Sequence, residues 1–123
     1  TLEAIDCILS HSDALPLTDL FRRKEGFVHT ASDGQKYDVS TPSLRAAASY
    51  KYFGNGDGVV IYSGLDEAGQ LIYTVVFNAA ERESPYVLDV ILHNNVIQTQ
   101  AHATDMHGFS EVNFAITGLI DVE

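Results

Sequence analysis

The stretch "GFVHTASDG", residues 26–34, decides the fold. Its alternate residues share one face of an extended strand: Phe27, His29, Ala31 and Asp33. Asp-Gly is a frequent turn pair, so the pattern predicts a strand that ends at Asp33 and turns at Gly34. The aspartate would then stand at the carboxyl end of a strand, where open α/β sheets bind their ligands.

The segment "IQTQAHATD", residues 97–105, repeats this pattern and ends in a second aspartate, Asp105. If the two strands are neighbours, the carboxylates of Asp33 and Asp105 converge to within a few ångströms. Two ionised carboxylates repel each other, so such a pair persists when a divalent cation neutralises it or when the two share a proton. Carboxylate oxygens favour Mg²⁺ or Mn²⁺ over zinc. Turn formation and helix capping remain open as the alternative role of both aspartates.

Other residues near this pair are candidates for weaker reasons. His102 and His107 flank Asp105 and are either metal ligands or polar residues that surround it. The run 81–83, "ERE", has the composition of a solvated loop, and "GNGDG" at 54–58 that of a turn, since it lacks the lysine and helix of a phosphate-binding loop.

The rest of the chain predicts helices and strands in a mixed order. Helical patterns cover 1–11, 17–24, 41–49, 86–95 after Ser84-Pro85, and 111–118 after a Ser110 N-cap. Strand patterns cover 59–64 and 71–79, joined as an antiparallel hairpin, and 119–123. We expect an α/β fold, a mixed sheet flanked by helices, in which residues 1–25 form a helical lead-in to a domain at 26–123.

Composition narrows the class of protein. The chain has 123 residues, 46% of them hydrophobic, which predicts one globular domain. A lone Cys7 and the lack of a 20-residue apolar run favour an intracellular protein without a membrane span. The net charge is −10, and residues 63–123 hold nine acidic side chains against one basic, so this surface repels phosphate backbones. The first residue is not Met and the end reads as an unfinished strand, so we expect a piece of a longer protein.

Several strings, spread over residues 27–123, resemble one family when taken in order. They are "SDGQKY", "SYKYFG", "GVVIYS", "SPYVLDVIL" and "TDMHGFSEVNFAITGLI". The chain thereby resembles the catalytic region of the DDE transposases of the Tn-three family of replicative transposons. The resemblance implies an RNase H-like fold, cut off before its last strands and before the helix that bears a third carboxylate. Met106 departs mildly from the family's usual motif at that position.

The resemblance also implies a chemistry. Asp33 and Asp105 would be two of three catalytic carboxylates and would hold Mg²⁺ or Mn²⁺, weakly or not at all in this piece. Glu111 and Glu123 come too early to be the third. The parent would be an oligomeric bacterial transposase, cytoplasmic and nucleoid-associated, that nicks transposon ends and joins them to target DNA. The isolated piece is expected to be inactive and to bind DNA weakly at most. Two alternatives stay open: a non-catalytic α/β interaction module derived from such an enzyme, and a hydrolase of small molecules with an aspartate acid and base.

Overall fold

The computed structural model describes the chain except residues 1, 16–19, 21–26, 42–45, 49–55 and 94–95. The elements follow one another as α1 (Leu2–Asp13), β1 (His29–Val39), β2 (Ala47–Ala48), β3 (Asp57–Asp66), β4 (Leu71–Asn78), α3 (Ser84–Leu92), β5 (Ala101–Thr104) and α4 (Glu111–Leu119). The expected helix at 17–24 lies almost wholly outside the described residues. Apart from the segments 41–49 and 119–123, the order of the other strands and helices agrees with that predicted from the sequence.

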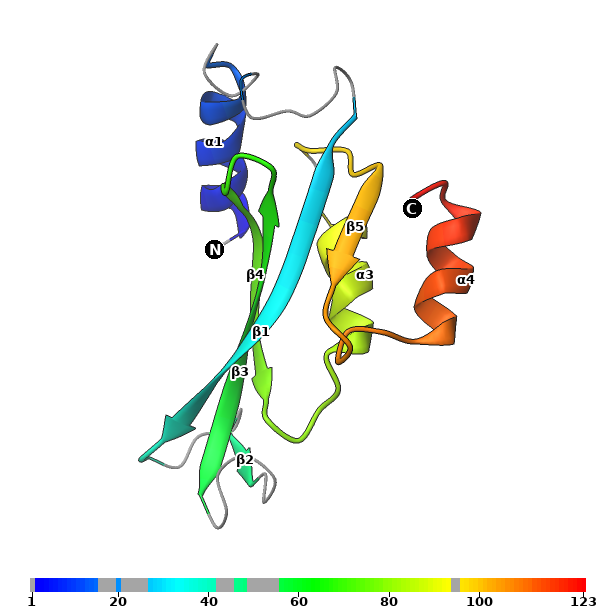
Figure 1. Cartoon of the computed structure of the whole chain (residues 1–123). Coiled ribbons are helices and arrows are strands. Elements are labelled where there is room, and N and C mark those ends of the chain that lie inside the picture. The colour runs from blue at the N-terminus through cyan, green and yellow to red at the C-terminus, as the bar shows by residue number, and fades with distance from the viewer. Residues whose placement is uncertain (1, 16–19, 21–26, 42–45, 49–55, 94–95) are drawn as a thin grey trace.

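The five strands form one mixed sheet in which β1 is central (Figure 1). The path runs β2-β3-β1-β5, and β4 also pairs with β3. β1 is antiparallel to β3 along ten rungs and parallel to β5 along four, from His29 opposite Ala101 to Ser32 opposite Thr104. The first strand and the strand that leads to Asp105 are therefore neighbours and point the same way.

The β3–β4 hairpin forms as the sequence predicted. Its turn is held by Asp66, whose Oδ1 accepts hydrogen bonds from the amides of Ala68 and Gln70. Gly69 supplies the positive φ of 74° that this turn needs. One face of β3 is fully buried, with Val60 1% and Tyr62 0% exposed, and this face carries the core.

Helices cover the sheet from two sides (Figure 1). α1 packs beside β4 and buries Leu9 in the core cluster, whereas α3 packs on β3 and β4 through Val87, Val90 and Ile91. At Gly64 the approach is so close that a Cβ would lie 2.5 Å from Val90 Cγ1. α4 lies outside α3 and begins at the Ser110 N-cap, which accepts a hydrogen bond from the Asn113 amide as expected.

Several local predictions were wrong. Asp33-Gly34 is no turn, because pairing with β3 carries β1 on to Val39. The helix expected at 41–49 falls partly outside the described residues, but Ala47–Ala48 is a strand. Within 54–58, Asp57 and Gly58 begin β3.

The ends of later elements also differ from the predictions. The α3 N-cap is Glu83, not Ser84. The strand expected at 97–105 is confined to Ala101–Thr104. Residues 120–123 form no strand; instead Glu123 exchanges backbone hydrogen bonds with Gln100 and His102 at the outer edge of β5. Strand pairing and helix capping thus set boundaries that differ from the predicted ones, while the α/β class and the RNase H-like arrangement are as predicted.

Candidate metal centre

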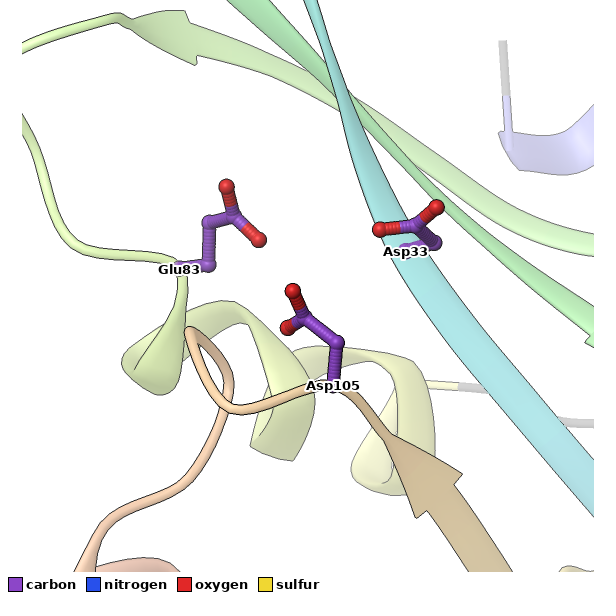
Figure 2. Close-up of side chains that lie close together, drawn as sticks. All are labelled: Asp33, Glu83 and Asp105. Atoms are coloured by element: carbon purple, nitrogen blue, oxygen red, sulfur yellow. The ribbon is translucent and has the colours of Figure 1, made fainter.

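The parallel pairing of β1 with β5 brings the two predicted aspartates together. Ser32 opposes Thr104 in the last rung, and each aspartate is the next residue on its strand. Asp105 follows the end of β5, as the sequence predicted, whereas Asp33 lies within β1. Both carboxylates are exposed, and each offers an oxygen within 4.8 Å of the other (Figure 2).

A third carboxylate, that of Glu83 at the start of α3, lies across from Asp33 and close to Asp105 (Figure 2). One oxygen from each of the three side chains lies within 4.8 Å of the other two. Assigning Glu83 to a solvated loop was wrong: the residue is 4% exposed, although its neighbours Glu81 and Arg82 are exposed as expected. It stands at the N-cap of α3, and packing of α3 on the sheet carries it inward.

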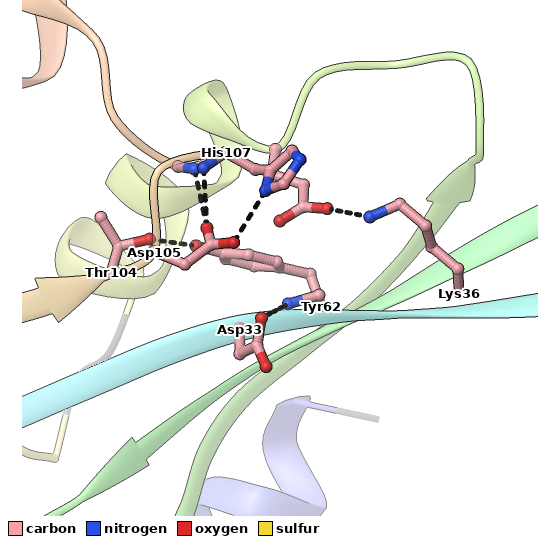
Figure 3. Close-up of polar contacts among 9 residues, drawn as sticks. Asp33, Lys36, Tyr62, Thr104, Asp105 and His107 are labelled. Atoms are coloured by element: carbon pink, nitrogen blue, oxygen red, sulfur yellow. Dashed lines mark hydrogen bonds and ion pairs between the residues drawn. The ribbon is translucent and has the colours of Figure 1, made fainter. Parts of the chain in front are cut away.

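Glu83 pairs with the cation Lys36 and occupies the space left by the missing side chain of Gly34. Lys36 Nζ donates a hydrogen bond to Glu83 Oε1 at 2.9 Å, and the two form an ion pair (Figure 3). A Cβ at Gly34 would lie 2.7 Å from the Glu83 carboxyl carbon and 2.8 Å from both its oxygens. The carboxylate therefore occupies the space that any other residue at position 34 would fill.

Asp105 is fixed in place by its own loop. Its Oδ1 accepts hydrogen bonds from the amides of His107 and Gly108, and its Oδ2 contacts His107 Nδ1 at 2.9 Å (Figure 3). Partial burial would raise the pKa of this carboxyl, but the His107 side chain and then the two amides outweigh it and hold the pKa below its usual range. Asp105 is thus a stable anion with a set orientation.

His102 takes part in a separate network behind the carboxylates. Its Nδ1 lies 2.7 Å from Thr30 Oγ1 and its Nε2 2.8 Å from Ser32 Oγ, which in turn lies 2.6 Å from the buried Tyr62 hydroxyl. Burial lowers the pKa of His102 to about 4. Of the two histidines beside Asp105, His107 contacts that carboxylate, and His102 has both ring nitrogens engaged with β1.

The three carboxylates fit a hard divalent cation. Oxygens bound to Mg²⁺ at about 2.1 Å lie roughly 3 Å apart when adjacent and about 4 Å when opposite. The three oxygens lie within 4.8 Å of one another, so adjacent ligand positions would need them to approach by up to about 2 Å, a movement that rotation of the two exposed aspartates allows. All the donors are carboxylate oxygens, as Mg²⁺ and Mn²⁺ prefer.

Three hollows adjoin the carboxylates. One, of about 470 Å³, lies at Asp33 over β1 and β3. The other two bear on how a ligand reaches the cluster. One, of about 330 Å³, is lined by Lys36, Arg82 and His107 together with Glu83. The other, of about 580 Å³, is an apolar groove between β5, α3 and α4 that reaches Asp105 and includes Phe109 and Phe114. A charged ligand at the carboxylates therefore has a hollow of mixed charge on one side, where Lys36 and Arg82 stand beside Glu81 and Glu83, and apolar surface on the other.

A mixed sheet flanked by helices, whose neighbouring parallel strands place acidic residues side by side, agrees with the RNase H-like fold of a DDE domain. More particularly, the chain belongs to the Tn3 transposase DDE domain family, whose model matches residues 1–123. The family expected from the sequence is thereby confirmed.

Individual transposases are also similar to this chain. Over 92 residues, 74% of this chain, it is 29% identical to the transposase for transposon Tn1546 of Enterococcus faecium and 32% identical to that for Tn2501 of Escherichia coli. The match spans 9% of the length of each relative. No solved structure matched the chain. Among the described residues, no helix has the length and apolar character needed to cross a membrane.

Proposed function

We propose that this chain supplies Asp33 and Asp105 as metal-ligating, catalytic residues of a transposase that cleaves and joins DNA strands. The observation that carries the proposal is the convergence of the two carboxylates across the parallel β1–β5 pair, in a chain that belongs to the Tn3 transposase DDE domain family. Mg²⁺ or Mn²⁺ is the proposed cofactor because the donors are all carboxylate oxygens.

The proposed reaction consists of two successive phosphoryl transfers, whose only reactants are water and DNA. In strand cleavage, a water oxygen bonds to phosphorus, the P–O3′ bond breaks, and the DNA 3′-oxygen leaves as a hydroxyl. In strand transfer, that 3′-hydroxyl bonds to a phosphorus of target DNA and displaces another 3′-hydroxyl. A divalent ion held by Asp33 and Asp105 would polarise the phosphate and activate the attacking water or 3′-hydroxyl.

The chain's own residues orient these groups. His107 and two backbone amides hold the Asp105 carboxylate, so it needs little rearrangement to bind a cation. Lys36 and Arg82 line the hollow beside the carboxylates together with Glu81, Glu83 and His107, and we propose that a phosphate approaches from this side, next to the two cations. The overall charge of −10 opposes broad contact with DNA, and we therefore propose that most DNA-binding surface lies elsewhere in the parent protein.

Mn²⁺ binding tests the roles of the aspartates. We expect the chain to bind Mn²⁺, followed by loss of the free-ion electron paramagnetic resonance signal, and Mg²⁺ to compete. Asp33→Asn and Asp105→Asn should each weaken binding at least tenfold, whereas Asp38→Asn, at an exposed aspartate on the same strand, serves as the matched control. Unchanged affinity in both active-site variants would refute the assignment.

Activity belongs to the complete transposase. In it, Asp33→Asn and Asp105→Asn should abolish cleavage of transposon ends, with Asp38→Asn active. The 123-residue chain alone should neither cut DNA nor bind it strongly, and cleavage by the purified chain would contradict this. Oligomeric assembly of the parent, its location at the bacterial nucleoid, and the division of the chain at residue 25 stay predictions.

A further inference from the structure

We infer that Glu83 is an additional carboxylate ligand of this metal centre, that Gly34 makes room for it, and that Lys36 is its counter-ion. This inference rests on the proposed function. It concerns a residue that precedes Asp105 in the chain and is therefore distinct from the downstream glutamate that the family resemblance implies.

The position of Glu83 is the first argument. Its carboxylate belongs to the same group of oxygens, all within 4.8 Å, as those of Asp33 and Asp105 (Figure 2). A buried carboxylate beside two others raises the electrostatic free energy of the fold unless cations compensate it. Glu83 is 4% exposed, so water does not provide that compensation.

Gly34 is the second, independent argument. It lies within the regular strand β1, opposite Tyr62, where an alanine would suit the extended backbone. Its missing Cβ is needed because the Glu83 carboxyl carbon and oxygens would lie 2.7–2.8 Å from it. The glycine therefore serves close approach of an anion to the strand beside Asp33, and not the turn that the Asp-Gly pair predicted.

Charge balance is the third argument. Asp33, Glu83 and Asp105 together carry three negative charges, and Lys36 pairs with Glu83 at 2.9 Å. Among these residues, one divalent cation would balance the remaining charge of −2. Lys36 bonds one oxygen of Glu83, and a carboxylate has a second oxygen with which to bind a metal. The ion pair thus holds Glu83 in place for the cation.

The test compares Mn²⁺ affinities in the whole 123-residue chain, with circular dichroism to confirm folding. Glu83→Gln keeps an oxygen that can accept from Lys36 but loses the charge, and we expect Mn²⁺ affinity to fall about tenfold. Gly34→Ala displaces the Glu83 carboxylate without altering any ligand, and we expect a fall of several-fold. Glu111→Gln, at an exposed glutamate in the first turn of α4, is the matched control and should leave affinity unchanged.

A second readout separates a ligand from a residue that only supports the fold. Saturating Mn²⁺ should raise the melting temperature of the wild-type chain more than that of Glu83→Gln. Combining Gly34→Ala with Glu83→Gln should weaken binding no further than Glu83→Gln alone, because both changes act through one carboxylate.

The outcomes are distinguishable from those of the proposed function. If Asp33→Asn loses Mn²⁺ while folded Glu83→Gln binds it within twofold of wild type, the role of Glu83 is refuted and the aspartate site stands. If neither substitution changes affinity, both proposals fail. Additive losses in the Gly34→Ala, Glu83→Gln combination would overturn the role assigned to Gly34.

Discussion

Replacing Lys36 with Met would remove the cation from a buried ion pair while keeping a side chain of similar length. Lys36 Nζ lies 2.9 Å from Glu83 Oε1, and the two side chains are 21% and 5% exposed. At that distance, with an effective dielectric constant of about 20, the attraction is about 6 kcal/mol before desolvation and the exposed part of Lys36 are counted. Losing one partner of such a pair leaves a buried, unpaired carboxylate, and we expect the metal-free chain to lose about 2–4 kcal/mol of unfolding free energy.

Urea unfolding followed by circular dichroism, with a chelator present, measures this loss. The double variant Lys36→Met, Glu83→Gln should regain most of the stability because no unpaired charge remains, so the cycle should give a coupling of about 2 kcal/mol or more. Added Mn²⁺ should narrow the gap between Lys36→Met and wild type, since the ion supplies the missing positive charge. A loss below about 0.5 kcal/mol, which is typical of a solvent-exposed pair, would refute the reasoning.

Three further predictions concern the surrounding fold. Burial lowers the pKa of His102 to about 4, so the unfolded chain takes up a proton there at higher pH than the folded chain. The stability that neutral His102 contributes is therefore complete above pH 6.5 and is lost as pH falls toward 4. Between these pH values, the unfolding free energy of wild type should fall by about 2 kcal/mol more than that of His102→Gln. Gly64→Ala should lower the unfolding free energy by about 1–3 kcal/mol because its Cβ would overlap Val90. Gly118→Ala, in open space on α4, should raise it by about 0.5–1 kcal/mol. Thermal melts that rank the two variants otherwise would contradict the packing described. Asn113 donates to the carbonyls of Ser84 and Gly108, so Asn113→Ala should cost about 2 kcal/mol in urea unfolding, and a neutral result would show that those carbonyls find other donors.

The sequence alone predicted the class of fold and pointed to two of the three carboxylates that the structure brings together. Alternation along 26–33 and 97–105 is a local property, because successive side chains of a strand point to opposite faces whatever the rest of the chain does. The β-branched runs of β3 and β4 and the Ser110 cap are local in the same sense, and all three were predicted correctly. Once the family resemblance was added, Asp33 and Asp105 stood out as the candidate pair.

Only the tertiary structure decided what surrounds that pair. Glu83 is fifty residues from Asp33 in a stretch of charged side chains, and nothing local distinguishes it from its exposed neighbours Glu81 and Arg82. Its burial follows from the packing of α3 on the sheet, and its contact with Gly34 from the register of β1 against β3. The Asp-Gly turn was mispredicted for the same reason: ten rungs of antiparallel pairing outweigh the turn preference of two residues. Local preference chooses the strand, but long-range pairing decides where it ends and which charges meet beside it.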